Sequence, residues 1–442
     1  MRFRIPHPLV LLLGGVIVAA ALTWALPAGE FDRRDDPATG RRVVVAGTYH
    51  EVERSPVGPF GALVSLPQGF VEGGEVIAAI LFVGGAWVVV DGLGTLGRLV
   101  GAIARAFRRR NRLAIPVVSF FFASMGALEN MQEEIIPIVP VLLLLGRRLR
   151  VDAVVVVAMS AGAAMIGSAF GPANPFQAGI AMQLAELAPL SGGGVRVISL
   201  AAAFVVWVIW TLRYAEKHGS IGGSGDETDD LGPASTLDVM IFLMMLAPMA
   251  AYVYGAIALG WGFNELSAGY VAAAIAAGLL GGLGLAGTLD GYLAGMQALL
   301  PAAVMVGVAR SISVVLADGR VIDTILSGLS APLSQVSATT AALLMIPFHV
   351  IVHIPVSSVS GHAVLTMPVL VPLSDLLGIS RQVTVMAYQT GAGLTELITP
   401  TNGALMAVLL AAGVSFERWF KFALVGVLLV LPIGILAMMA LR

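Results

Sequence analysis

The sequence predicts an all-α polytopic membrane protein built from an inverted-topology repeat, with two re-entrant hairpins and two broken helices. The first observation is composition, because 58% of the 442 residues are hydrophobic and only 12% are charged. The second is that apolar runs of spanning length, about 20 residues, recur along the chain. The third is that two apolar runs carry a polar centre, at residues 126–134 and 355–362.

Composition and motifs also exclude several functions. The net charge is −2 and no basic patch is large enough for nucleic acid, so we expect a lipid bilayer and a small molecule as partners. Cysteine is absent, which excludes disulfides and thiolate chemistry. No Walker motif, Gly-x-Ser-x-Gly elbow or His-Glu-x-x-His supports an ATPase, a hydrolase or a zinc protease. We therefore expect no enzyme, no transition metal and no cofactor, apart from a coupling Na⁺ or H⁺.

The first 74 residues predict one membrane helix and an external loop. Residues 1–29 resemble a signal peptide, but the many spans that follow favour an uncleaved first helix at 1–27. Arg2 and Arg4 place its start in the cytoplasm. Residues 28–74 then form an external loop, with a short β-hairpin around Pro37-Ala-Thr-Gly40 and an amphipathic segment at 57–71.

Residues 75–215 form the predicted first repeat. A span at 76–106 carries Asp91 and ends in an arginine cluster. The apolar run that follows has arginines on both sides, so it should leave the cytoplasmic face and return to it. Its roughly 33 residues are too few for two crossings of about 20 residues each. We therefore predict a re-entrant hairpin at 113–146.

A broken helix at 151–190 completes this repeat. Its interruption lies at 171–176, where Asn174 is a helix cap and Pro175 suits the first helical position. The chain returns to the cytoplasm through 195–215, and the Gly- and Ser-rich residues 216–236 form a cytoplasmic linker.

The second half contains connecting helices at 237–290 and a second repeat at 291–442. We expect spans at 237–255, 267–286 and 298–316, a re-entrant hairpin at 339–377, and a helix at 380–413 that breaks at 399–403. Thr399 is the expected cap of that break, ahead of a proline. Arg418 and Lys421 place the start of the last span inside, so the C-terminus is external.

The repeat itself rests on matched positions. Ile115-Pro116 matches Ile346-Pro347, and Val139-Pro140 matches Val371-Pro372, at a nearly constant offset. The first hairpin opens from the inside and the second from the outside. Inverted repeats of this kind place a binding site at the membrane midplane, between discontinuous helices.

The candidate site residues lie at the two tips and the two breaks. Helix N-termini attract the carboxylate of a substrate, and hydroxyls and amides supply the hydrogen bonds that a polar substrate loses when it leaves water. Carboxylates at membrane depth can hold a cation. The predicted substrate-binding residues are Asn130, Glu134, Asn174, Ser357, Ser358, Ser360, Thr399, Thr401 and Asn402, and the coupling-ion candidates are Glu129, Glu133, Glu134 and Glu396.

Structural roles compete with these assignments. Glu133 stands three residues after Asn130, which is also the spacing of a capping box. Each serine can bond back to a helix carbonyl instead of a ligand. His349 and His353 have metal-like spacing, but without a third ligand we expect them to pack, whereas His362 could titrate near neutral pH.

The chain resembles a known family over nearly its whole length. The motifs that carry the resemblance are Pro27-Ala-Gly-Glu-Phe-Asp-Arg33, the pair Glu133-Glu134, Asn174-Pro-Phe176, and a stretch from Leu365-Thr-Met-Pro to Leu397-Ile-Thr-Pro-Thr-Asn-Gly403. They are similar to the DcuC-like C4-dicarboxylate carriers, in their YfcC and ArcD-like branch, within the ion transporter superfamily. The resemblance implies secondary carriers of dicarboxylates or amino acids, a homodimer and elevator-type motion. The chain departs from the family at Gly391-Ala-Gly393 and Thr395-Glu396, where relatives often read Gly-Asp-Gly and Thr-Asn.

These observations together favour a secondary active transporter of the bacterial inner membrane. Its expected substrate is a small carboxylate-bearing metabolite, above all an amino acid, because carboxylates outnumber cations at the predicted midplane. A basic amino acid is included in this hypothesis, and a C4-dicarboxylate is the alternative. An ion channel and an intramembrane enzyme are the other classes, and neither a continuous pore nor a nucleophile with its base is evident.

Overall fold

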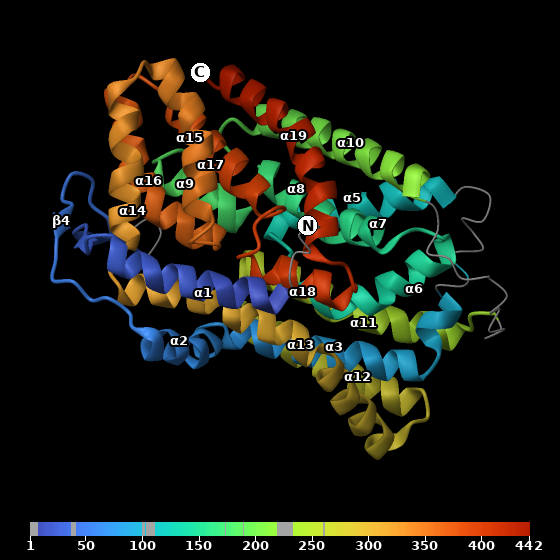
Figure 1. The fold of residues 1–442 in the computed structure, drawn as a ribbon. Coiled ribbons are helices and arrows are strands. Elements are labelled where there is room, and N and C mark those ends of the chain that lie inside the picture. The colour runs from blue at the N-terminus through green and yellow to red at the C-terminus, as the bar shows by residue number, and fades with distance from the viewer. Residues whose placement is uncertain are drawn as a thin grey trace.

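The computed structural model describes residues 8–36, 41–99, 102, 111–172, 174–188, 190–218, 233–259 and 261–442. Helices make up most of this part of the chain (Figure 1), so the predicted all-α class is confirmed. Six of the described helices are long and apolar enough to cross a membrane. The elements are α1 (Pro8–Ala25), β1 (Gly29–Glu30), β2 (Arg33–Asp36), β3 (Arg41–Val44), β4 (His50–Glu51), α2 (Pro59–Glu72), α3 (Gly74–Gly92), α5 (Asn111–Glu129), η1 (Glu133–Ile138), α6 (Val139–Leu149), α7 (Ala153–Val157), η2 (Ala158–Gly162), α8 (Ala163–Phe170), η3 (Pro175–Gly179), α9 (Ile180–Leu184), α10 (Gly193–His218), α11 (Thr236–Ala258), α12 (Phe263–Leu280), α13 (Gly284–Asp318), α14 (Ile322–Ser330), η4 (Ala331–Gln335), α15 (Ala338–His353), α16 (Val359–Leu376), α17 (Arg381–Thr395), α18 (Gly403–Ala411) and α19 (Phe416–Ala440).

The segment after α1 contains the β-hairpin that the sequence predicts. Strand β2 pairs antiparallel with β3, and β1 pairs antiparallel with β4. Asp323 of α14 holds this segment in place, because its carboxylate accepts the backbone N–H of Phe31 at 2.9 Å and forms an ion pair with Arg33 at 2.9 Å. The amphipathic segment predicted next is the helix α2.

The helices form two layers. The first layer contains α1, α2, α3, α11, α12 and α13, most of which fill the lower part of Figure 1. The long helix α13 packs against α1, α2 and α3. Glycines permit the close approach of α3 and α13, because a Cβ on Gly295 would lie only 2.8 Å from the Cα of Gly85.

The second layer contains α5–α10 and α15–α19, which include the two polar centres. Helix α5 runs parallel to α8, because Ala123 meets Gly167 while Ala127 meets Gly171 further along both helices. Since both helices run in the same direction, the chain between them must turn back, and η1 with α6 does so. A Cβ on Gly167 would lie 2.7 Å from the carbonyl carbon of Ala123, so these helices touch backbone to backbone.

The second half repeats this arrangement. Helix α15 runs parallel to α17, because Ile346 meets Gly391 and His353 meets Glu396 further along. Here α16 is the returning segment. Helices α15 and α16 lie at the end of the molecule where the strands are found, and α6 lies at the opposite end (Figure 1). Helix α16 also packs against β3.

Two expected spans differ from the helices that form. Helix α3 ends at Gly92 rather than continuing to residue 106, because Gly94 turns the chain with φ +70°. Helix α13 is a single helix of 35 residues that begins at Gly284 rather than near 298. Its exposed Asp290 and Gln297 interrupt the apolar pattern, and for that reason hydropathy placed its start too late.

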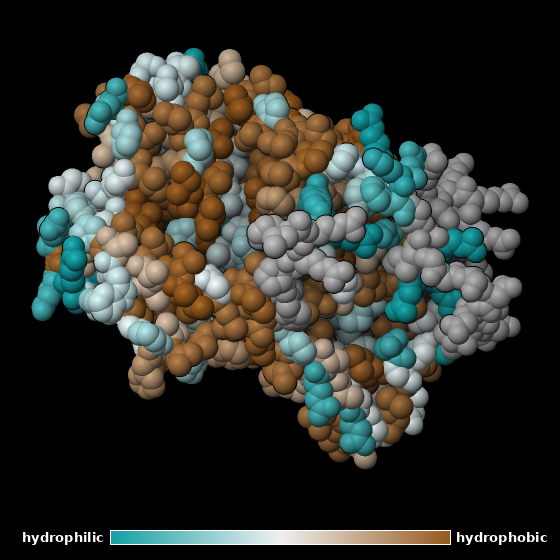
Figure 2. Space-filling model, viewed as in Figure 1, coloured by the Kyte–Doolittle hydropathy of each residue, from teal (hydrophilic) through white to brown (hydrophobic). Residues whose placement is uncertain are grey.

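Polar and apolar side chains separate on the surface. In Figure 2 the apolar residues cover most of the middle of the visible face, whereas polar residues gather at its left and right ends.

Two expectations fall outside the described residues: most of the arginine cluster before α5, and positions 219–232 of the predicted linker.

Candidate functional site

A cavity of about 400 Å³ lies between the two layers. It is lined by the tip before η1, by α13, by the start of α16 and by the break before α18. The structure therefore brings both hairpin tips and the second break to one cavity. The predicted site residues that line it are Asn130, Glu133, Glu134, Ser357, Ser358, Ser360, Glu396 and Asn402.

Three predicted residues, Asn174, Thr399 and Thr401, lie behind this lining. Asn174 is fully buried and connects the first break to the first tip. Its Nδ2 donates to Asn130 Oδ1 at 3.2 Å, and Ser168 Oγ donates to the same Asn130 oxygen. Asn130 itself has φ +62°, a left-handed conformation that asparagine tolerates better than most residues. The first break thus supports the shape of the tip from behind.

Asn174 also begins the helix after the first break, as its sequence predicts. Its Oδ1 accepts the backbone N–H groups of Phe176 at 2.9 Å and Gln177 at 3.0 Å. Phe176 reaches the cavity wall, whereas Gln177 is buried. The cap therefore satisfies two N–H groups that an approaching substrate would otherwise meet.

The first tip does not contain the capping box that the spacing of Asn130 and Glu133 allows. The helix-capping position before η1 is Gln132, and no side chain caps it. Glu134 accepts the backbone N–H of Gln132 at 3.1 Å. Glu133 is half-buried and lines the cavity. The side chain of Glu129 lies outside the described part of the structure.

The second tip carries three serines with different duties. Ser357 Oγ donates to the carbonyl of Thr401 at 3.0 Å and so ties the tip to the second break. Ser358 caps α16 by accepting the N–H of Gly361 at 3.3 Å. Ser360 lies in the first turn of α16 and lines the cavity.

The second break is capped by Asn402 rather than by the expected Thr399. Helix α17 ends at Thr395, and α18 does not begin until Gly403, because the chain turns between them. Asn402 Oδ1 accepts the N–H of Leu405 at 3.0 Å. Thr399 and Thr401 share a hydroxyl hydrogen bond of 2.7 Å within the turn. The proline at 400 thus belongs to the turn and not to the helix start.

Glu396 joins the cavity to a buried row of histidines. Its Oε2 accepts from Asn402 Nδ2, and its Oε1 pairs with His353 Nε2. His353 Nδ1 lies 3.3 Å from His362 Nδ1, and His362 Nε2 lies 2.8 Å from His349 Nδ1. All three imidazoles are fully buried. The four side chains form one continuous hydrogen-bonded row.

The sequence predicts packing for His349 and His353 and does not connect His362 with them. The i, i+4 spacing does place the first two on one helix face, and His362 inserts between them from the other hairpin arm. Within the described residues, no group of three or more His, Cys, Asp or Glu could hold a metal ion. The three imidazoles and Glu396 are joined to one another by hydrogen bonds.

Negative charge dominates the cavity wall. Five carboxylates face one guanidinium there: Glu72, Glu75, Glu133, Glu134 and Glu396 against Arg310, the single basic residue among the described lining residues. Arg310 Nε lies 3.9 Å from Glu72 Oε2. This balance suits a ligand that brings positive charge. The starts of α16 and α18 can offer a carboxylate the N–H groups other than those of Gly361 and Leu405, which the caps bond.

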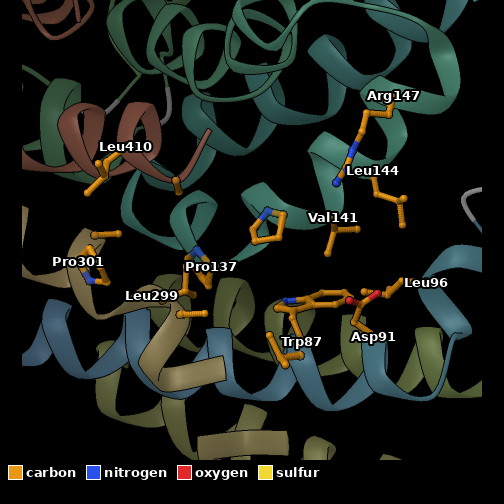
Figure 3. Close-up of a pocket in the computed structure, with 15 residues that line it drawn as sticks. Trp87, Asp91, Leu96, Pro137, Val141, Leu144, Arg147, Leu299, Pro301 and Leu410 are labelled. Carbon is orange, nitrogen blue, oxygen red and sulfur yellow. The ribbon is translucent and has the colours of Figure 1, made fainter. Parts of the chain in front are cut away.

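A second cavity, of about 480 Å³, lies between the same two layers (Figure 3). Trp87 and Leu299 of the first layer face Pro137 and Val141 of the second across it. Its charged residues include Asp91 of α3 and Arg147, which extends from α6 toward the cavity. Its wall is otherwise mainly apolar, so it does not resemble a site for a charged substrate.

Comparisons with known proteins agree with the resemblance carried by the motifs. A relative from Escherichia coli K12, named "Putative basic amino acid antiporter YfcC", is 29% identical over 95% of this chain and 93% of its own length. An uncharacterized protein from Haemophilus influenzae is 24% identical over 96% of this chain and 94% of its own.

Two solved structures match nearly the whole chain at low similarity. The YdaH transporter of Alcanivorax borkumensis has a TM-score of 0.44 and 16% identity, with 98% of each chain covered. MtrF of Neisseria gonorrhoeae has a TM-score of 0.41 and 17% identity, covering 99% of this chain and 95% of its own. The family model described as DcuC, the C4-dicarboxylate anaerobic carrier, matches residues 5–442. The chain, a multi-pass membrane protein, therefore belongs to the DcuC family of transporters and is not an enzyme.

Proposed function

We propose that this protein is a secondary active transporter of a small carboxylate-bearing metabolite, with a basic amino acid as the favoured substrate. The observation that carries the proposal is the cavity between the layers, where both hairpin tips and the second break meet under an excess of carboxylates. A zwitterion or a cationic amino acid would balance this charge, whereas a bare dianion would add to it. The name of the Escherichia coli relative supports the same class of substrate.

The two ends of an amino acid would find different partners. Its carboxylate would lie at the N-termini of α16 and α18, near the hydroxyls of Ser357 and Ser360. Its ammonium group would lie between Glu133 and Glu396, which face the same space. Transport would be coupled to a cation, Na⁺ or H⁺, or would proceed by exchange.

The alternative substrate is a C4-dicarboxylate. The description of the family favours it, and so do the neutral donors of Ser357, Ser358 and Asn402 at the cavity. In that case the carboxylates would be protonated or would bind a coupling cation. The two substrates make opposite demands on the charge of Glu133, which provides a test.

We further propose an elevator-type mechanism in a homodimer. The two parallel helix pairs, α5 with α8 and α15 with α17, support re-entrant hairpins that open from opposite membrane faces, as in an inverted repeat. Both cavities lie where the two layers meet, so one layer could move along the other. The N-terminus would be cytoplasmic and the C-terminus external, in a bacterial inner membrane.

Thermal unfolding of the purified protein tests the substrate class. Arginine, lysine, neutral amino acids, succinate and fumarate are each added with and without sodium and across pH. A ligand present at 100 times its Kd stabilises the folded state by about 2.7 kcal/mol. We expect arginine or lysine to raise the melting temperature.

The variant Glu133→Gln tests whether the charge of the cavity decides which compound binds. Glu133→Gln keeps the shape of the cavity and removes one charge, so it should weaken stabilisation by arginine more than stabilisation by a neutral amino acid. Stabilisation by succinate or fumarate alone, retained or improved in Glu133→Gln, would reject the amino acid in favour of the dicarboxylate. If no compound of either class binds, the proposal fails.

A further inference from the structure

The buried row of Glu396 and three histidines has an open end. Every ring nitrogen of His353 and His362 is used in a hydrogen bond. Only His349 Nε2 remains, and it is buried without a hydrogen-bond partner among the described residues. The opposite end, Glu396, lies at the wall of the substrate cavity. The row thus connects the cavity with a buried nitrogen that can accept a proton.

The row has two complete hydrogen-bonding patterns. In the first, Glu396 is ionised, His353 Nε2–H donates to it, His362 Nδ1–H donates to His353, and His349 Nδ1–H donates to His362. Every imidazole is then neutral and His349 Nε2 carries a lone pair. In the second pattern each bond is reversed: Glu396 is a carboxylic acid that donates to His353, and His349 carries its hydrogen on Nε2.

The two patterns differ by one proton. When a proton binds His349 Nε2, its Nδ1 proton passes to His362, the Nδ1 proton of His362 passes to His353, and the Nε2 proton of His353 passes to Glu396. Each step breaks one N–H bond and forms one N–H or O–H bond, and no other reactant is required. Loss of the proton from His349 reverses every step and ionises Glu396. The charge of Glu396 at the cavity is therefore linked to the protonation of His349 Nε2, which does not contact Glu396.

A purely structural role does not need this arrangement. One imidazole and the amide of Asn402 already satisfy both oxygens of Glu396. The other two histidines add fully buried polar groups, and His349 Nε2 has no hydrogen-bond partner among the described residues, which costs stability. Buried ionisable groups at membrane depth commonly form proton relays.

Other titratable groups also surround Glu396. Glu133 and Glu134 face the same cavity from η1, and Arg310 faces it from α13. Tyr388 of α17 packs against two of the imidazoles and donates its hydroxyl to the carbonyl of Val359. Two further carboxylates and one guanidinium therefore share the cavity with Glu396.

We propose that Glu396, His353, His362 and His349 form one proton-binding unit, and that a proton and the cationic group of the substrate bind alternately at Glu396. This inference rests on the proposed function and identifies its coupling ion as H⁺. Ionised Glu396 binds the substrate cation. Protonated Glu396 is neutral and releases it. Movement of the site between the membrane faces in these two states exchanges substrate for protons.

Infrared difference spectroscopy of the purified protein tests the unit without a substrate. A pH titration should show a carboxylic acid band that is lost in Glu396→Gln. The decisive variant is His349→Phe, which keeps a ring of similar size and does not contact Glu396. We expect it to move the midpoint of the Glu396 band to lower pH, because the protonated pattern then leaves the Nε2–H of His362 buried without an acceptor.

The control is His218→Phe, at the exposed end of α10, which should leave the midpoint unchanged. His362→Phe gives a second reading of the same effect if His349→Phe does not fold. An unchanged Glu396 midpoint in a folded His349→Phe or His362→Phe protein would overturn the proposal.

Proton release on ligand binding provides the second measurement. The compound among arginine, lysine, aspartate and succinate that raises the melting temperature is added to weakly buffered protein containing a pH-sensitive dye. The wild type should release a proton when this compound binds, and Glu396→Gln should bind it without release. Binding without proton release in the wild type would reject the alternating scheme and leave the proposed function intact. Absence of binding by all four compounds would reject the proposed function, while the infrared result still decides whether the proton-binding unit exists.

Discussion

Gly167→Ala tests the packing that holds the first tip in place. A Cβ at this position would lie 2.7 Å from the carbonyl carbon of Ala123 and closer still to its oxygen. The obstacle is backbone, so no side chain can rotate away. The two helices would have to separate by roughly 1 Å to restore ordinary contact, and overpacking of this kind typically costs about 1–3 kcal/mol. We therefore expect a lower melting temperature.

The same substitution should also reach the site. Gly167 precedes Ser168, which hydrogen-bonds to Asn130 at the tip, so a separation of α5 and α8 strains that contact. Ligand-induced stabilisation should fall together with the melting temperature of the free protein. Thermal unfolding with and without the bound ligand measures both effects on one sample.

Gly14→Ala is the matched control. Nothing lies within 4 Å of a Cβ built on this glycine, which is also in a helix, α1. Alanine favours a helix interior by up to about 1 kcal/mol over glycine, so this variant should be as stable as the wild type or slightly more stable. Equal stability of Gly167→Ala and the wild type would mean that α5 and α8 do not touch as described.

Two further substitutions test contacts far apart in the sequence. Asp238→Asn removes the charge of a buried carboxylate that pairs at 2.6 Å with the quarter-exposed Arg98, and it should lower the unfolding free energy by about 2 kcal/mol. Glu417→Gln, in a mostly exposed pair, should change it by less than about 0.5 kcal/mol, and equal losses would refute the argument from burial. Asn174→Ala removes both helix-capping bonds and the contact with the first tip, so it should cost about 2 kcal/mol and weaken ligand-induced stabilisation. If folded Asn174→Ala keeps the full ligand-induced stabilisation, the first break does not support the binding site.

The sequence predicts the local features of this fold well. Hydropathy locates most helices, and the turn residues of 37–40 mark the β-hairpin. Asn174 is recognisable as a cap because proline follows it directly, where a helix can begin. Asn402 is not, because the nearby proline suggests an earlier start and only the course of the turn fixes where α18 begins.

Contacts between distant segments could not be predicted in the same way. The spacing of His349 and His353 shows that they share a helix face, but not that His362 of the other arm lies between them. The pairing of Arg98 with Asp238 likewise depends on how α11 packs near the end of α3. Gly167 is one of 52 glycines, and nothing in its neighbourhood in the sequence marks it as the point where two backbones meet.

The unbroken course of α13 supplies a length scale for any movement between the layers. Leu299 lines the apolar cavity, and Val306, two helical turns later, lines the acidic one. At about 1.5 Å per residue, these positions lie about 10 Å apart along the helix axis. A displacement of the second layer by this distance would bring Gly403 of α18, which now meets Val306, level with Leu299. Distances measured between a probe on α13 and a probe on α18 should therefore fall into two populations separated by about that length, and a single population would mean that the layers stay fixed.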